Sequence, residues 1–339
     1  MSNNPYIVAE LSCNHLGSLP RALDLILAAK NVGADAVKLQ CWHPDRMCVD
    51  REYMITSKPW QGSRLYDLYQ AAFTPWEWFP ILFERAKALG IECFASVFDV
   101  EALAFLETLD CPRYKIASFE ITDLPLIRAV AHTGKPIVIS TGMATESEVF
   151  AAAGVAFECA PDRETVRPTL LKCTSAYPAP VAEANLRTML NLKVPGVAVG
   201  LSDHTLGPVV PVVATALGAT MIEKHLTLYR SDGGPDAAFS SEPQEFKATV
   251  LACREAKLAL GEVKYGPTEA ERPSLIFRRS LYVRRPLPKG MILTPEVIAS
   301  AIVSARPALG LPPSHPILGR RVLRDLPAGT PLTEADLEG

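Results

Sequence analysis

Short apolar runs alternate with longer amphipathic stretches up to about residue 260, and this regular repeat constrains the fold more than any other feature. Eight β-prone runs cover residues 6–9, 36–39, 92–95, 113–116, 136–139, 169–171, 197–200 and 219–222. Helical patterns are found at residues 19–32, 75–89, 100–109, 124–133, 146–158, 208–218 and 246–260. Several of them end at a glycine, as is typical of a helix C-terminus. Eight strand–helix units in a row predict an α/β fold, the (β/α)8 TIM barrel.

A doubly wound sheet is the rival fold, but it usually has fewer strands, and no G-x-G-x-x-G turn follows any of the eight runs. We therefore predict a barrel over residues 1–262. A polar linker follows at 263–276, and short β runs separated by Pro- and Gly-rich turns then predict a small β-rich domain at 277–339.

One long segment interrupts the repeat after the second predicted strand. It covers residues 41–74 and carries several aromatic residues, namely Trp42, Trp60, Tyr66 and Tyr69. A long loop at the C-terminal end of a barrel strand is usually functional.

Charge and composition narrow the class of partner. A net charge of −3 argues against nucleic acid or an anionic membrane. The first predicted strand leaves no room for a signal peptide, and the most apolar stretch, 209–219, is too short to span a bilayer. The eight cysteines include no C-x-x-C pair, so we expect buried, reduced thiols in a cytoplasmic protein.

Two histidines occupy matching positions after the seventh and eighth predicted strands. His204 ends the string Ser202-Asp203-His204, and His225 ends Glu223-Lys224-His225. Because neighbouring parallel strands end at one edge, the two imidazoles are placed to share a divalent metal. A single strand-end histidine is more often a hydrogen-bonded core residue, so both interpretations stay open at this point. Strand alternation turns Glu223 and His225 to one side and Asp203 away from His204, which predicts a structural role for Asp203.

Polar or ionisable residues follow all eight predicted strands and should converge on one cavity. They include three lysines, Lys38, Lys115 and Lys172, together with several hydroxyl groups. Such a set suits a highly charged anion such as phosphate. Lys115 is also a candidate Schiff-base nucleophile of an aldolase, although such an aldolase needs no pair of metal-binding histidines.

These strand ends, in this order, resemble the sialic acid synthase family over nearly the whole chain. The matching strings are IVAEL at 7–11, ADAVKLQ at 34–40, YKIASFE at 114–120, STGM at 140–143, CTSAYP at 173–178, GLSDHT at 200–205, IEKH at 222–225 and RRSL at 278–281. Within the family the chain is most similar to the pseudaminic acid synthases, on LYDLY at 65–69, TPWEW at 74–78 and GGPDAAFS at 233–240. Ala237 stands where neuraminate-type relatives usually have a histidine, so we expect a different environment for the sugar.

The resemblance implies a metal-dependent barrel followed by an antifreeze-like (SAF) domain. It implies condensation of phosphoenolpyruvate with 2,4-diacetamido-2,4,6-trideoxy-L-altrose and water, with release of phosphate. His204 and His225 would bind Mn²⁺ or Mg²⁺, and Glu120 would be the acid or base. The phosphoenolpyruvate cradle would consist of Lys38, Lys115, Ser96, Ser118, Ser140 and Ser202, with further contacts from Gln40 and Ser175. The sugar would meet Glu10, Asp236 and Tyr177.

The resemblance also implies a homodimer in which the tail domain lies over the partner's barrel. Arg279 would then enter the partner's site, with Arg278 a near-equal candidate. Alternatives within the family are a neuraminate or legionaminate synthase, acting on N-acetylmannosamine or on the diacetamido-trideoxy-mannose. Outside it, a Schiff-base aldolase or a non-catalytic binding protein built around the tail domain remains open.

Overall fold

The computed structural model describes residues 4–57, 59–162, 167–193, 196–302 and 310–339. The chain divides into two compact units, Met1–Gly261 and Glu262–Gly339. The first unit contains eight parallel strands that form a closed barrel in sequence order, because β8 pairs with β1. This confirms the predicted barrel and excludes the doubly wound sheet. The strands are β1 (Tyr6–Glu10), β2 (Ala36–Cys41), β3 (Glu92–Val97), β4 (Tyr114–Ile116), β5 (Ile137–Ser140), β6 (Thr169–Cys173), β7 (Ala198–Asp203) and β8 (Met221–His225).

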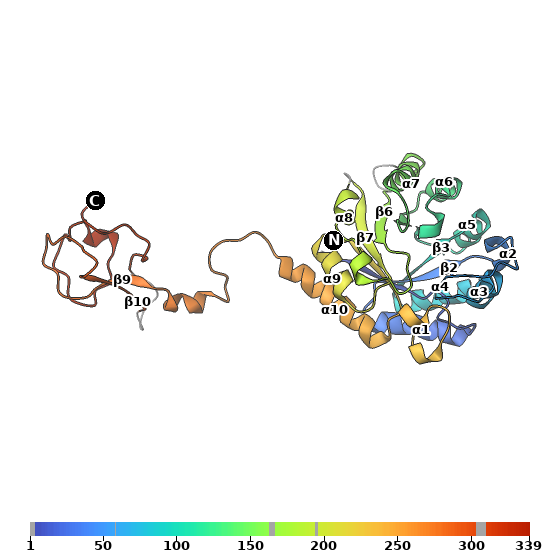
Figure 1. The fold of residues 1–339 in the computed structure, drawn as a ribbon, viewed down its shortest axis with the longest axis horizontal. Coiled ribbons are helices and arrows are strands. Elements are labelled where there is room, and N and C mark those ends of the chain that lie inside the picture. The colour runs from blue at the N-terminus through green and yellow to red at the C-terminus, as the bar shows by residue number, and fades with distance from the viewer. Residues whose placement is uncertain (1–3, 58, 163–166, 194–195, 303–309) are drawn as a thin grey trace. The chain divides into compact units, whose positions relative to one another are not determined.

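Helices lie outside the ring of strands (Figure 1). They are α1 (Leu19–Asn31), α2 (Pro44–Met47), α3 (Leu65–Ala72), α4 (Phe79–Leu89), α5 (Val100–Glu107), α6 (Leu124–His132), α7 (Glu146–Glu158), α8 (Thr188–Asn191), α9 (Val209–Ala216) and α10 (Pro243–Leu260). Short 3₁₀ turns are found at Trp76–Trp78, Ser118–Glu120, Val181–Glu183, Arg230–Asp232 and Ala237–Phe239.

Capping side chains fix where several helices begin. The side chains of Ser18, Asp99, Asp123 and Thr145 accept hydrogen bonds from the first turns of α1, α5, α6 and α7. A cap of this kind stabilises a helix by about 1 kcal/mol. At the other end of α4, Gly90 adopts a left-handed conformation with φ 63°, which glycine does without steric cost.

The core lies between the strands and the surrounding helices. Strand residues such as Val8, Phe94 and Ile139 and helix residues such as Leu25 and Leu82 are fully buried. Strands covered on both faces read as apolar runs, which is why the sequence pattern located all eight. The packed core holds the strands rigidly, so the residues at their carboxyl ends are fixed in space.

The strand register places the polar strand-end residues at neighbouring levels. Glu10 pairs with Lys38 of β2 on one side and with His225 of β8 on the other. On the next strands, Ser96 is opposite Lys115, and Ser202 is opposite Glu223. The barrel therefore brings these side chains to one end, although they are far apart in the sequence.

The second unit is a small β-rich body with its own apolar core. Its antiparallel strands are β9 (Ser280–Val283) and β10 (Ile298–Ala301), and 3₁₀ turns lie at Arg272–Phe277 and Glu334–Asp336. The core is built from residues such as Leu281, Leu287 and Leu332. Across both units, no helix in the described part of the chain is long and apolar enough to cross a bilayer.

Candidate active site

A cavity of about 380 Å³ opens at the carboxyl ends of the barrel strands. Most of the residues predicted for the site line it, namely Lys38, Gln40, Ser96, Lys115, Ser118, Glu120, Ser140, Tyr177, Ser202, His204, His225 and Asp236. Active sites of this fold lie at this end of the barrel.

Two lysines and two glutamates form a buried charge network at the floor of the cavity. Lys38 Nζ lies 2.5 Å from Glu10 Oε2 and 3.6 Å from Glu223 Oε2. Lys115 Nζ lies 3.3 Å from Glu223 Oε1, which also accepts a hydrogen bond of 2.9 Å from Ser202 Oγ. Each charge is compensated, which buried ions require.

Glu223 is the centre of this network. Burial would raise the pKa of its carboxyl group, but Lys115 and Lys38 outweigh that effect and lower the pKa to about 2. Burial lowers the pKa of Lys115, and the Glu223 carboxylate opposes that shift. The network therefore places two lysine side chains where an incoming anion can bind, and the Glu223 carboxylate holds both of them in position.

Hydroxyl groups and one backbone amide surround the lysines. Lys38 Nζ donates to Ser96 Oγ at 2.9 Å, and the Gly142 N–H donates to Ser118 Oγ at 3.1 Å. A Cβ atom at position 142 would collide first with Ser175 Oγ and would also lie only 2.7 Å from Ser118 Oγ, so glycine allows this close approach. Within the described residues, Ser140 Oγ is buried and has no hydrogen-bond partner. These groups fit the oxygens of a phosphate or carboxylate.

His204 and His225 face each other at the side of the cavity, with ring centroids 5.3 Å apart. His204 Nδ1 lies 3.0 Å from the carbonyl oxygen of Thr174, which in the neutral ring puts the proton on Nδ1 and leaves the lone pair on Nε2. Burial opposes the charged ring, but the Cys173 sulfur and the Thr174 carbonyl outweigh burial and raise the pKa of His204, so a metal ion would have to displace a proton there. His225 Nδ1 is buried, lies 3.7 Å from Asp236 Oδ2 and has no hydrogen-bond partner in the described part of the chain. Burial and the nearby His204 lower the pKa of His225, which favours the neutral form that binds a metal.

The two histidines fit a divalent metal held with open coordination positions. Among the described residues, no cluster of three or more His, Cys, Asp or Glu side chains is arranged around such an ion. A metal ion held by these two imidazoles would keep several coordination positions for water and substrate, and open positions of this kind are a feature of catalytic metal sites.

Glu120 ends the 3₁₀ turn Ser118–Glu120 and lines the cavity. Burial raises the pKa of its carboxyl group to about 7. Its Oε2 is buried and has no hydrogen-bond partner within the described ranges. A carboxyl group that titrates near neutral pH can both give and take a proton.

Aromatic and polar groups enclose the histidine side of the cavity. The Tyr177 ring lies 4.4 Å from the His204 ring and 5.0 Å from the Phe239 ring, measured between centroids. Ser12 Oγ donates to Asp236 Oδ2 at 2.5 Å. Tyr177 and Asp236 thus line the cavity beside the histidine pair.

Comparisons with known proteins identify the family of the chain. The model of the NeuB family matches residues 25–265. The chain belongs to the NeuB family. The model of the SAF domain matches residues 278–338.

Relatives of known name cover the NeuB chain almost completely. A pseudaminic acid synthase of Helicobacter pylori is 44% identical over 100% of this chain and 99% of its own. One of Campylobacter jejuni is 42% identical over 98% and 96%. A solved N-acetylneuraminic acid synthetase of Leptospira borgpetersenii is 31% identical, with a TM-score of 0.72 over 81% of this chain and 91% of its own.

Three predicted residues of this NeuB protein lie outside the cavity lining. Glu10 faces Lys38, and its Oε1 accepts a hydrogen bond from Gln40 at 2.9 Å. Ser175 lies beside Cys173, with Oγ 3.8 Å from the sulfur. Arg279 lies in the second unit and is exposed, as is Arg278. The role predicted for Arg279 stays a prediction.

The expectation that Lys172 points into the cavity is wrong. Its Nζ donates to the carbonyl oxygen of Cys173 at 2.7 Å, and the side chain lines a separate depression outside the barrel. Cys173 lines the cavity, and successive side chains of a strand alternate between faces. Lys172 therefore points to the opposite face of β6 from Cys173. Two lysines, not three, reach the cavity floor.

Two features of the structure, the position of Trp60 and the Lys224–Asp203 ion pair, are not among the sequence predictions. Trp60 lines the cavity from the insertion after β2 and donates from Nε1 to the carbonyl oxygen of Pro235 at 3.0 Å. Lys224 and Asp203 form a fully buried ion pair of 2.6 Å between β8 and β7. Strand alternation turns Lys224 and Asp203 away from the cavity. Opposite charges at these two positions on neighbouring buried strands are the sequence signal that indicates an ion pair.

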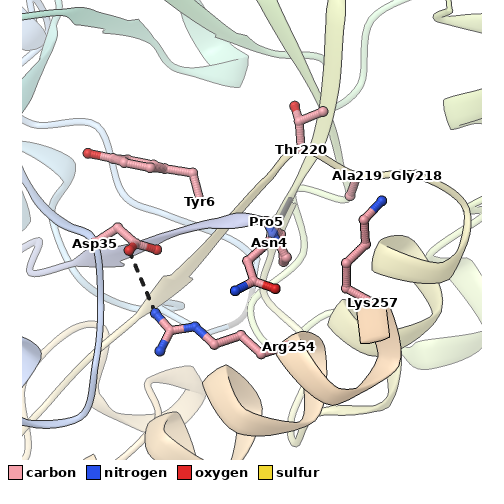
Figure 2. A pocket seen from close by; sticks show the side chains of 9 residues that line it. All are labelled: Asn4, Pro5, Tyr6, Asp35, Gly218, Ala219, Thr220, Arg254 and Lys257. Atoms are coloured by element: carbon pink, nitrogen blue, oxygen red, sulfur yellow. Dashed lines mark ion pairs between the residues drawn. The ribbon is translucent and has the colours of Figure 1, made fainter. Parts of the chain in front are cut away.

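Figure 2 shows a depression at the amino ends of the strands, lined by residues such as Tyr6, Asp35, Arg254 and Lys257. Its volume is about 490 Å³. Asp35 accepts from the Ile7 N–H at 2.8 Å and faces Arg254 at 3.6 Å, so these groups join α10 to the barrel. Such contacts at this end of a barrel serve stability.

Proposed function

We propose that this protein is a pseudaminic acid synthase. It would condense phosphoenolpyruvate with 2,4-diacetamido-2,4,6-trideoxy-L-altrose and water and release phosphate. The observation that carries the proposal is the buried network of Lys38, Lys115 and Glu223 beside the facing histidines, in a chain that aligns along its length with synthases of that name.

The cavity floor would bind phosphoenolpyruvate. Its phosphate and carboxylate carry several negative charges, and Lys38 and Lys115 supply the opposite charge in a dry environment. The hydroxyls of Ser96, Ser118 and Ser202 would complete the cradle. Fixed donors of this kind also stabilise charge that develops during the reaction, without reorganisation.

His204 and His225 would hold Mn²⁺ or Mg²⁺. When bound there, the ion supplies a Lewis acid for the sugar's aldehyde group. Asp236 and Tyr177 would orient the open-chain sugar so that its aldehyde carbon faces C3 of phosphoenolpyruvate.

The reaction forms a carbon–carbon bond between C3 and the aldehyde carbon. Water then adds at C2, and the resulting hemiketal phosphate loses phosphate by C–O cleavage. The aldehyde oxygen gains a proton and the attacking water loses one. Glu120, with a pKa raised to about 7 by burial, is suited to hold and transfer this proton.

We also propose a homodimer in which the tail domain of one copy covers the barrel mouth of the other. Five loops around the mouth carry large apolar side chains that are more than half exposed, namely Phe119, Met143, Val181, Leu206 and Tyr229. Exposed apolar groups gathered at one end suit an interface. Light scattering should give twice the chain mass, and a monomer that is fully active would refute this arrangement.

The eight free cysteines, seven of them buried, suit a reducing compartment, and we place the reaction in the cytoplasm.

Phosphate release with Mn²⁺ tests the reaction directly, with the diacetamido-trideoxy-altrose, the diacetamido-trideoxy-mannose and N-acetylmannosamine offered separately. Release only with the altrose is expected. Release only with another sugar keeps the chemistry and changes the substrate.

Absence of release from metal-replete protein would refute catalysis of this kind. Borohydride trapping tests the rival aldolase, because burial lowers the pKa of Lys115 and so favours a nucleophilic amine. An adduct at Lys115 would support the rival.

A further inference from the structure

The segment between β2 and α4, residues 42–75, gives the cavity one apolar side. Helix α3 presents Leu65, Leu68, Tyr69 and Ala72 to the cavity. Their spacing of three, four and seven residues places all four on one helix face. The preceding loop adds Ile55 and Trp60. We name Ile55, Trp60, Leu65 and Leu68 the apolar wall.

The apolar wall differs in chemistry from the cavity floor. Apart from Ser57 and the hydroxyls of Tyr53 and Tyr69, every described residue that this segment contributes to the cavity is apolar. The floor carries the lysines, Glu223 and the serine hydroxyls. A ligand that fills the cavity therefore needs an anionic part at one end and apolar atoms at the other.

The wall residues are not simply the packed core of the segment. That core is a separate cluster of Cys13, Trp42 and Ala72, with Tyr69 and Phe98 packed against it. Ile55, Leu65 and Leu68 are only half-buried and border the open space. Half-buried apolar side chains that face a cavity are free to bury the apolar atoms of a ligand.

Trp60 fixes the wall across the cavity. Its indole Nε1 donates to the carbonyl oxygen of Pro235, at 3.0 Å. Its ring centroid lies 5.5 Å from that of Tyr177, which in turn lies beside His204. Pro235 directly precedes Asp236, so the indole joins the wall to the part of the cavity next to the two histidines.

We propose that the apolar wall selects the sugar by receiving its methyl groups. This proposal rests on the proposed function. Phosphoenolpyruvate carries no methyl group and would occupy the charged floor. The diacetamido-trideoxy sugar has three methyl groups, two on its acetamido substituents and one at C6. N-acetylmannosamine has one methyl group and a hydroxymethyl group at C6.

The wall would discriminate in two ways. Buried methyl groups leave water favourably, whereas a hydroxyl placed against Leu65 or Leu68 would lose its hydrogen bonds to water without replacement. One methyl group in a close-fitting pocket changes kcat/KM by about 10- to 200-fold. The floor and the histidines would remain indifferent to the substituent at C6.

Polar substitutions in the wall test the proposal. Ile55→Asn and Leu68→Asn should lower kcat/KM for the diacetamido-trideoxy sugar by about 10- to 200-fold, while the KM for phosphoenolpyruvate changes less than about two-fold. Val49→Asn is the matched control, because Val49 lies in the same segment but is 99% exposed. An equal loss with N-acetylmannosamine, or a matching rise in the KM for phosphoenolpyruvate, would overturn the proposal.

A binding measurement separates this proposal from the proposed function. The diacetamido-trideoxy sugar and its 6-hydroxy counterpart are titrated calorimetrically into the parent protein and the Leu68→Asn variant, without phosphoenolpyruvate. Tighter binding of the 6-deoxy sugar by the parent alone supports the wall, even if phosphate is never released. Equal binding of both sugars by the parent, or no binding of either, refutes it.

Discussion

The buried ion pair between Asp203 and Lys224 gives a stability prediction. The side chains are 1% and 2% exposed, and the charged atoms lie 2.6 Å apart. Lys224→Met removes the ammonium group, which also donates to the carbonyl oxygen of Thr205. It leaves a buried carboxylate, whose other oxygen is held by the N–H and Oγ1 of Thr205. Loss of one partner of a buried pair costs about 3–5 kcal/mol.

This cost is a large part of the free energy of unfolding of an ordinary domain, which is about 5–15 kcal/mol. For a unit of this size the same loss lowers Tm by about 6–20 °C. A second substitution tests whether the uncompensated charge of Asp203 causes the loss of stability. Asp203→Asn in the Lys224→Met background removes the uncompensated charge and keeps an acceptor for Thr205, so it should recover more than half of the loss.

Tryptophan fluorescence during urea unfolding measures the effect. All four tryptophans, Trp42, Trp60, Trp76 and Trp78, belong to the barrel unit, so the signal follows that unit alone. The reasoning is refuted if Lys224→Met costs less than about 1 kcal/mol, the range of exposed pairs. It is equally refuted if the double variant is no more stable than the single one.

Three further predictions concern the cavity. Glu120→Gln should lower kcat/KM by about 10²–10⁴-fold. The parent carboxyl is protonated below its pKa of about 7, so the parent rate should fall above that pH, whereas the rate of the variant should not. An unchanged pH profile in the variant would contradict the role of Glu120. Gly142→Ala should displace the Ser175 and Ser118 hydroxyls and raise the KM for phosphoenolpyruvate by about 10-fold or more with little change in Tm, and an unchanged KM would argue against the cradle. Chelation should abolish phosphate release, and His225→Asn should weaken Mn²⁺ binding measured by electron paramagnetic resonance; equal affinity in the variant would exclude His225 as a ligand.

Much of the fold follows from local sequence pattern. Strands buried on both faces must be apolar along their length, so all eight could be located without the structure. Alternation along β8 also separated Glu223 and His225 from Lys224, and the structure has that arrangement. The same rule turns Lys172 away from the cavity, because its neighbour Cys173 on β6 faces it.

Other features depend on contacts that no local pattern contains. Trp60 acquires its place through Pro235, 175 residues further along the chain. Gly142 matters because a Cβ atom would crowd Ser175 and Ser118, which is a property of the folded backbone and not of a side-chain pattern. The central position of Glu223 arises from two lysines on different strands, so only the closed barrel reveals it.

Because the barrel closes between its first and last strands, the site can be assembled only at the end of folding. The ribosome delivers Glu10 and Lys38 long before Glu223, and Ser12 meets Asp236 only after a further 224 residues. Contacts between distant residues form late, because the entropy of the intervening chain opposes them. Until β8 docks, the lysines lack the counter-charge of Glu223. A nascent chain that stops short of β8 is therefore inert, and the first turnover of a new molecule reports that its barrel has closed.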